Sequence, residues 1–390
     1  MLKNPKNRTD DPQQVYQPRR VLNVPGIFAN LDGMGTLRFA CCAVLLAAGT
    51  AAGGADLFEA RSGGYQTYRI PGIVITPRGT ILAYAEARKD GIGDWADIDI
   101  LLRRSADGGR TWEPPRLLAD AGAQTANNPV MIVERRNGVV HFLHCVQYAR
   151  AFHMRSRDDG KTFSAPAEIT PVFERFRSEY DWNVIATGPG HGIELRNGRL
   201  LVPVWLSTGG KSHRPSVVSV IYSDDHGETW QRGDIILGGL KNPSETVAVE
   251  LADGRVMLNI RNESPEHRRA VAISPDGARN WTAPRFDEAL PEPICMGSIV
   301  RVPGRRGPIV FVNPDHTGTR RNLTAKVSRD EGKTWRVSRV VDAGISAYSD
   351  IAARGRTLYV FYERGGIGRN IYDTEYLTLV TFRLAAGERR

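Results

Sequence analysis

The sequence predicts an all-β chain folded as a six-bladed β-propeller, and three observations support this class. The octapeptide SADGGRTW at residues 105–112 recurs in four further copies, which begin at Ser156, Ser223, Ser274 and Ser328. Successive copies start 51, 67, 51 and 54 residues apart, so residues 56–390 hold about six such periods. A four-stranded blade with its three hairpins takes about 40 to 60 residues, which matches this period.

The segments between the copies are the third observation, because they read as short β-strands. They are rich in β-branched and aromatic residues and are punctuated by Asn-Gly, Asp-Gly or Arg-Gly pairs that suit hairpin turns. We expect strands within residues 72–87, 137–149, 197–207, 253–262 and 355–364. No long helical periodicity is present, so we expect no long helix.

The octapeptide itself reads as a turn. Asp107 is placed to accept hydrogen bonds from backbone amides, Gly109 to take a positive φ, and Trp112 to pack between strands. A calcium site is the alternative, but each copy supplies only one or two carboxylates, short of a calcium shell. We therefore predict structural turns, with Ala278 making one copy the least certain to keep the geometry. The equivalent aspartates are Asp158, Asp225, Asp276 and Asp330.

Composition indicates a globular chain with a large core, since 41% of the 390 residues are hydrophobic and 24% are charged. The net charge is +9, yet the basic residues are scattered and form no Lys or Arg run. We expect no nucleic-acid partner. A basic surface suits anionic substrates, although it serves solubility equally well.

The amino-terminal region predicts export. Residues 38–55 form an apolar run that ends in small residues, has about the length of a signal-peptide core and is too short to span a membrane. Met34 stands just before it as the expected true start. We predict a leader over 1–55, a β-propeller domain over 56–390, a secreted or periplasmic location and no membrane span in the mature chain. A buried helix is the alternative for the apolar run.

Cysteine usage leaves two possibilities for the domain. Cys41 and Cys42 fall in the leader, so only Cys145 and Cys295 remain, either as one disulfide or as two free buried thiols. There is no CxxC and no His-rich spacing, so we expect no metal and no cofactor.

Several motifs identify a family resemblance that spans nearly the whole expected domain. The octapeptides look like Asp boxes, and YRIP at 68–71 looks like the signature near the amino end of the same family. The chain resembles the exo-sialidases of bacteria and animals. This resemblance implies a sialidase-like propeller that hydrolyses terminal α-linked sialic acids of glycoproteins or glycolipids with retention of configuration. The likeness continues through 85–88, 93–105, 244–262, 320–335 and 347–351.

The resemblance implies three arginines that bind the substrate carboxylate. Arg69 in YRIP, Arg261 in LNIRN and Arg320 match the family positions, and Arg321 is the adjacent rival of the last. Guanidinium groups bind carboxylates bidentately and stay charged at every working pH, so arginine suits this task.

The resemblance also implies a tyrosine nucleophile, Tyr348, with Glu245 as its partner. A carboxylate nucleophile would be repelled by the carboxylate on the anomeric carbon, whereas a neutral phenol is not. A phenol has a pKa near 10 and needs a neighbouring base. Glu250, of opposite strand parity, is the rival base.

Asp94 is the expected general acid and base, selected by alignment on the LLRRS that follows it, with Asp97 and Asp99 as rivals. Its glycine-flanked loop suits exchange between substrate and water. Trp95 is expected to shield the site or to meet the substrate's N-acyl group, with plain packing as the alternative.

Two carboxylates are expected to support the site. Glu363 resembles the family residue that braces the first arginine, and Glu86 is expected near the same arginine. His191 in the glycine-rich GPGHGI is a weaker substrate candidate, because a lone histidine in such a loop is more often structural.

Three other functions share most of these features. A trans-sialidase or a hydrolase of a related ulosonic acid would carry the same catalytic set. A non-catalytic glycan-binding propeller would need no complete set of Asp, Tyr, Glu and three Arg, and all six residues are present.

Overall fold

The computed structural model describes residues 54–385, and within them the chain is all-β. Twenty-five strands are accompanied by one short helix, α1 (Thr170–Glu174), and one 3-10 turn, Ile367–Arg369. No helix in this part of the chain is both long and apolar enough to cross a membrane. The predicted leader, including Met34, Cys41 and Cys42, lies outside the described residues except for its last two positions.

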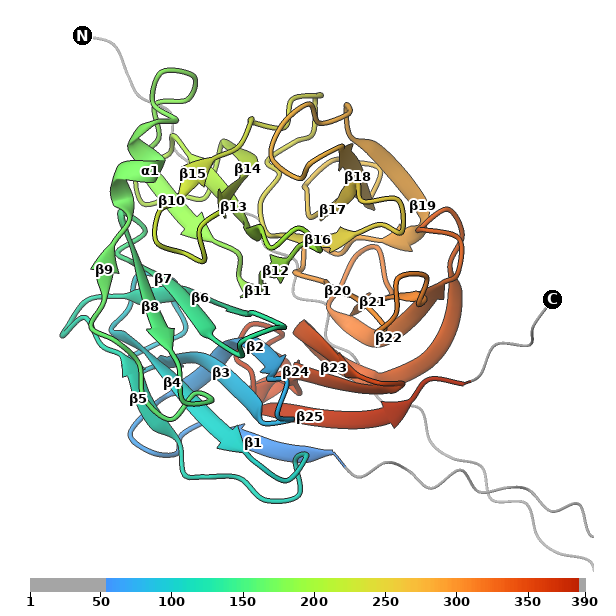
Figure 1. Ribbon diagram of the computed structural model, residues 1–390. Helices are drawn as coiled ribbons and strands as arrows, with labels where there is room; N and C mark the ends of the chain where they lie inside the picture. Colours follow the sequence, from blue (N-terminus) through green and yellow to red (C-terminus); the bar gives the residue numbers. More distant parts are fainter. Residues whose placement is uncertain (1–53, 386–390) are drawn as a thin grey trace, which may run out of the picture. The chain divides into compact units, whose positions relative to one another are not determined.

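The first two sheets follow each other along the chain (Figure 1). The first has the order β2 (Thr67–Ile75), β3 (Ile81–Arg88), β4 (Ile98–Ser105), β5 (Arg116–Ala119). The second has the order β11 (Gly190–His191), β6 (Ala126–Val133), β7 (Val140–Val146), β8 (Arg150–Ser156), β9 (Ala167–Glu168).

The third and fourth sheets come from the middle of the chain. The third is β10 (Val184–Thr187), β13 (Leu200–Ser207), β14 (Ser216–Ser223), β15 (Gln231–Arg232), with β12 (Ile193–Glu194) also paired to β13. The fourth is β16 (Thr246–Glu250), β17 (Val256–Ile260), β18 (Arg268–Ser274), β19 (Arg285–Pro291).

The last sheet has seven strands and joins the two ends of the described chain. Its order is β1 (Ala55–Glu59), β25 (Tyr376–Arg383), β24 (Thr357–Arg364), β23 (Arg336–Arg354), β22 (Arg321–Ser328), β21 (Ile309–Pro314), β20 (Ser298–Arg301). The long strand β23 pairs with β22 through residues 336–345 and with β24 through residues 346–354. It therefore divides the sheet into two groups of four strands that share β23.

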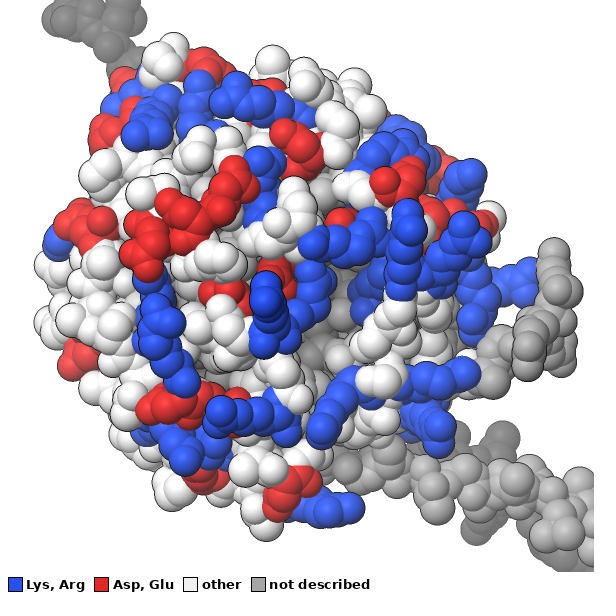
Figure 2. Space-filling model, in the orientation of Figure 1, with Lys and Arg blue, Asp and Glu red and all other residues white. Residues whose placement is uncertain are grey.

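The sheets succeed one another around a common centre, with β2, β11, β16 and β20 near that centre (Figure 1). All five predicted strand segments are confirmed as strands. The turn glycines that follow Asn137 and Asn197 have φ of 74° and 91°, as hairpins of this kind require. On the face drawn in Figure 2, basic side chains gather around a central hollow and acidic ones lie among them.

The octapeptides are turns, as predicted. In the first copy the Asp107 carboxylate accepts hydrogen bonds from the amides of Arg110 and Thr111, both at 3.0 Å, and from the Thr111 hydroxyl at 2.6 Å. The degraded copy keeps a contracted turn, in which Asp276 accepts from the amides of Ala278 and Arg279, one residue earlier than in the first copy.

The aromatic residue that ends each copy packs against a different hydrophobic cluster, so the repeats anchor successive parts of the core. These residues are Trp112, Phe163, Trp230, Trp281 and Trp335. Cys145 and Cys295 lie in two different clusters and are both buried and free, which excludes the disulfide between them.

Candidate active site

Three arginines converge on one tyrosine near the centre of the sheets. Arg69 is the third residue of β2, Arg261 follows β17, and Arg320 precedes β22. The guanidinium carbons of Arg69 and Arg320 lie 5.4 and 5.1 Å from the ring centroid of Tyr348. Arg261 donates a hydrogen bond from Nη1 to the Tyr348 hydroxyl at 2.8 Å. The structure thus brings together four residues that are separated by up to 279 positions in the sequence.

Protein groups hold each arginine but leave donors open. The Glu363 carboxylate accepts from Nε and Nη2 of Arg69 at 3.0 and 3.2 Å and also from the backbone amide of Tyr348 at 3.3 Å. Arg320 donates from Nη2 to the Ile294 carbonyl at 2.6 Å. The Nε of Arg261 is buried and has no partner among the described residues. Such donors suit an anionic ligand, because a buried unpaired donor is costly.

Glu363 thus contacts Arg69, the arginine that the family resemblance implies it braces. Of the two adjacent arginines, Arg320 is buried beside Tyr348 whereas Arg321 is exposed, so Arg320 remains the predicted substrate-binding residue.

Tyr348 and Glu245 form a buried pair. The Tyr348 hydroxyl donates to Glu245 Oε1 at 2.5 Å, and Glu245 also forms an ion pair with Arg261. Burial raises the pKa of Tyr348 well above its usual value, and the Arg261 charge opposes this rise. The phenol is thus neutral in the empty site and has a carboxylate in place to accept its proton.

The rival base lies elsewhere. Glu250 is at the far end of β16 and pairs with Arg196 at 3.2 Å. Only Glu245, just before β16 begins, contacts the tyrosine.

Asp94 lies on the loop between β3 and β4, with 36% of its side chain exposed. Its carboxylate is 3.0 Å from Nη2 of Arg88 and 3.8 Å from Nδ1 of His213. Burial raises the pKa of Asp94, but the charges of Arg88, Arg69 and His213 together outweigh this effect and hold the pKa below its usual value. Asp94 is therefore ionised in the empty site.

The two rival aspartates of this loop have structural partners instead. Asp97 and Asp99 lie 3.0 and 3.1 Å from Nζ of Lys89, and Tyr65 donates to Asp99 at 2.7 Å. Both are thereby engaged in ion pairs with a residue outside the arginine cluster.

Glu86 lies near Arg69, as expected, but forms its ion pair with another arginine. It lies opposite Arg69 in the β2–β3 register, but its ion pair is with Arg88 at 2.8 Å. The reason is strand geometry, since residues two positions apart on one strand point to the same face. Glu86 thus lies beside Arg69, as expected, while its ion pair supports Arg88, which holds Asp94.

Trp95 forms one wall of the site rather than standing alone. Its ring stacks on His213 with centroids 4.8 Å apart and lies 4.7 Å from the ring of Tyr148. Packing and shielding are both served by this arrangement, and contact with an N-acyl group remains a prediction.

Sequence reasoning missed three residues of the site: Arg88, His213 and Tyr148. Arg88 closes the AEAR segment, so its motif was visible although its contact with Asp94 was not. His213 comes from an irregular loop after β13, and Tyr148 has a positive φ of 55° in a turn. Neither position carries a local signal of its role.

His191 lies away from the substrate-binding groups. Its Nδ1 is 2.7 Å from Oδ1 of Asp350, and its ring lines a separate cavity. The residues that the structure describes contain no group of three His, Cys, Asp or Glu side chains able to hold a metal ion.

The arrangement can bind a carboxylate and carry out proton transfer on two sides of it. The charge of Arg69 interacts with both Tyr348 and Asp94, so the neutral phenol and the ionised carboxylate share one site. An arginine cluster, an acid with access to water and a phenol with a base are the parts that retaining hydrolysis of an anionic glycoside needs.

Comparison with known proteins agrees with this geometry. The family of BNR repeat-like domains matches residues 79–360. A sialidase of Micromonospora viridifaciens is 33% identical over 77% of this chain and 50% of its own length. A sialidase of Bacteroides fragilis is 32% identical over 69% of this chain and 54% of its own. The chain thus spans about half the length of these curated relatives.

Solved structures show the same likeness. The Hadza microbial sialidase Hz136 superimposes with a TM-score of 0.74 at 28% identity, covering 85% of this chain and 68% of that one. Trypanosoma rangeli sialidase in complex with the inhibitor DANA gives a TM-score of 0.67 at 20% identity, covering 85% of this chain and 59% of that one, which shows a shared fold.

Proposed function

The chain belongs to the family of BNR repeat-like domains, and on this basis we propose that it is an exo-α-sialidase that cleaves terminal α-linked sialic acids from glycoproteins or glycolipids. The single observation that carries the proposal is the convergence of Arg69, Arg261 and Arg320 on the Tyr348–Glu245 pair. The likeness to curated sialidases over most of the described residues supports the same reaction.

Substrate binding begins with the carboxylate on the anomeric carbon. The three guanidinium groups lie around Tyr348, the buried Nε of Arg261 has no partner among the described residues, and a carboxylate accepts several such bonds at once. Glu363 keeps Arg69 oriented when the site is empty, so little ordering is needed at binding.

Chemistry then proceeds by double displacement. The Tyr348 oxygen attacks the anomeric carbon while its proton passes to Glu245, and the bond from that carbon to the leaving oxygen breaks as Asp94 donates a proton to the oxygen. Water next attacks the tyrosyl intermediate, Asp94 takes a proton from the water, and Tyr348 regains its proton from Glu245. Two inversions at one carbon give net retention.

The fold and the location complete the proposal. The pairing of β1 with β25 and the division of the last sheet at β23 support a closed propeller of six four-stranded blades. Export to a secreted or periplasmic location rests on the apolar run at residues 38–55. The mass of the mature amino terminus tests export, and an intact Met1 would refute it.

Activity is tested with two substrates that differ in their leaving group. We expect turnover of both a fluorogenic aryl α-sialoside and a sialyl-lactose, with the α-anomer formed first by NMR. Asp94→Asn should lose far more activity on the sialyl-lactose, because a sugar alkoxide needs protonation more than a phenolate does. Asp97→Asn, from the same loop, is the matched control and should stay near wild type.

The other candidate functions give different results in the same assay. Transfer of sialic acid to added lactose would indicate a trans-sialidase, and turnover of a related ulosonide alone would indicate a different sugar acid. Saturable glycan binding without turnover would indicate a binding propeller and refute the enzyme proposal.

A further inference from the structure

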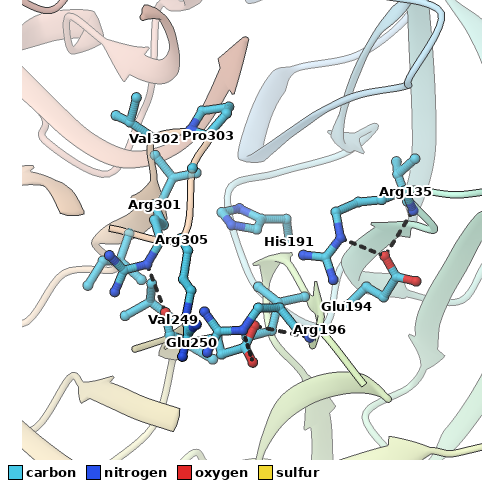
Figure 3. Close-up of a pocket in the computed structure, with 16 residues that line it drawn as sticks. Arg135, His191, Glu194, Arg196, Val249, Glu250, Arg301, Val302, Pro303 and Arg305 are labelled. Carbon is cyan, nitrogen blue, oxygen red and sulfur yellow. Dashed lines mark hydrogen bonds and ion pairs between the residues drawn. The ribbon is translucent and has the colours of Figure 1, made fainter. Parts of the chain in front are cut away.

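A second cavity lies at the opposite ends of the inner strands from the arginine cluster. Its volume is about 490 Å³, and residues near the ends of β6, β12, β16 and β20 line it (Figure 3). Strand β16 runs from the arginine cluster to the cavity, with Glu245 just before its first residue and Glu250 as its last. Glu245 and Glu250 lie about 17 Å apart along the strand, and neither Glu245 nor Tyr348 lines the cavity.

The inner end of the cavity is marked by His191. In Figure 3 this ring stands between Arg301 on one side and Arg135 on the other. It is paired with Asp350, a buried residue of β23 that also accepts a hydrogen bond from Ser298 at 2.7 Å. A hydrogen-bonded histidine–aspartate pair therefore forms this end of the cavity.

The outer part of the cavity carries an excess of positive charge. Four arginines line it against two glutamates, Glu194 and Glu250. Those glutamates pair with two of the arginines, and a third arginine pairs with Glu331 at 2.5 Å. The four arginines are Arg135, Arg196, Arg301 and Arg305.

Arg305 is the cation without an acidic partner. It is exposed on the turn after β20, and its Nε donates to the Ala252 carbonyl at 3.2 Å. No carboxylate within residues 54–385 forms an ion pair with it. Its charge is therefore available to a ligand that enters the cavity.

The walls below the arginines are apolar and well buried. A concave site with apolar walls and a few charged groups at its mouth is the usual form of a small-molecule site. A hydroxyl-rich sugar would find few hydrogen-bond partners on these walls, which separates the ligand class from that of the catalytic site. The apolar lining includes Val133, Ala248, Val249, Ile299 and Val302.

We propose that this cavity is a second ligand site, which binds a small organic anion with an apolar body and one carboxylate, phosphate or sulfonate group. The apolar body contacts the walls formed by β16 and β20, and the acidic group pairs with Arg305 at the mouth. The site is separate from the proposed hydrolysis, since neither Tyr348 nor Asp94 nor any of the three converging arginines lines it.

The test uses 8-anilinonaphthalene-1-sulfonate, which has this chemistry and fluoresces when its aromatic rings leave water. We expect saturable binding to the folded full chain. Arg305→Glu should weaken that binding at least about tenfold, because reversing a charge turns attraction into repulsion. Arg306→Glu is the matched control, since Arg306 is equally exposed on the same turn and does not line the cavity. Its affinity should stay within about twofold of wild type.

Competition separates the two sites. An excess of free sialic acid should leave the probe bound, and Tyr348→Phe should bind it as wild type does. Absence of saturable binding, equal losses in Arg305→Glu and Arg306→Glu, or displacement by sialic acid would each overturn the proposal. All three are binding measurements, so they stand apart from any loss of catalytic activity.

Discussion

Replacing Tyr348 by phenylalanine removes one oxygen atom from the centre of the site. That oxygen donates to Glu245 at 2.5 Å and accepts from Arg261 at 2.8 Å, so the variant loses both contacts and the nucleophile. We expect kcat to fall at least about 10³-fold, which corresponds to about 4 kcal/mol of transition-state stabilisation.

Stability should change much less than activity. A hydrogen bond to a charged group contributes about 1.5–3 kcal/mol. With an unfolding entropy of about 2.1 cal/mol/K per residue over some 330 residues, this loss lowers the thermal midpoint by about 2–4 °C. The protein should therefore remain folded at assay temperature while being almost inactive.

Tyr362→Phe is the matched control for this variant. Tyr362 is also buried and lies on β24, the strand that pairs with the Tyr348 segment of β23. Its hydroxyl donates to the carboxylate of Asp342 at 3.0 Å. It should show a similar loss of thermal midpoint and near wild-type turnover of the aryl sialoside. The assignment would be refuted if folded Tyr348→Phe kept more than about a tenth of wild-type kcat, or if the two variants lost activity equally.

Three further predictions concern charge and the repeats. Arg88→Gln removes a cation that lowers the pKa of Asp94, so it should move the alkaline limb of the kcat/KM profile to higher pH. Arg88→Lys keeps the charge and should leave the limb in place. An unmoved limb in Arg88→Gln would contradict this prediction. Burial lowers the pKa of His144 to about 4, so the unfolded state takes up its proton first and stability falls as pH drops from about 6.5 toward 4. Urea unfolding should show that His144→Phe reduces the loss between pH 7.5 and 4.5 by about 2–3 kcal/mol, and an unchanged loss would argue against this residue. Asp107→Ala should lower the thermal midpoint and leave kcat unchanged, and added calcium should not shift the wild-type midpoint if the carboxylate serves only the turn.

The repeat made the fold predictable because it is local. Ser105, Asp107 and Thr111 complete their hydrogen bonds within one octapeptide, so sequence alone contains the whole interaction. Strand pairing across the ends of the chain is different, since nothing near Ala55 indicates that it lies opposite Leu379. The count of repeats also gives no indication that one long strand, β23, pairs with both β22 and β24.

The candidate site was predictable only where a family motif marks the residue. Arg69, Glu245 and Tyr348 come together through contacts over long sequence separations, and only the resemblance suggested them. Arg88 and His213 act on Asp94 through side-chain geometry on a strand and a loop, which no spacing rule encodes. The ion pair of Glu86 with Arg88 was not predicted for the same reason, because two arginines lie near Glu86 and only the side-chain directions decide which one it contacts.

The charges of the empty site explain how Asp94 can begin the reaction as an acid although its pKa is low. Arg69 contributes to that low pKa and also belongs to the cluster that receives the substrate carboxylate. A bound carboxylate would neutralise part of the Arg69 charge and add a negative charge to the site, and both effects raise the pKa of Asp94. Substrate binding therefore promotes protonation of Asp94. Arg261 contacts Glu245 directly and holds it beside the Tyr348 hydroxyl, where it can accept the tyrosine proton.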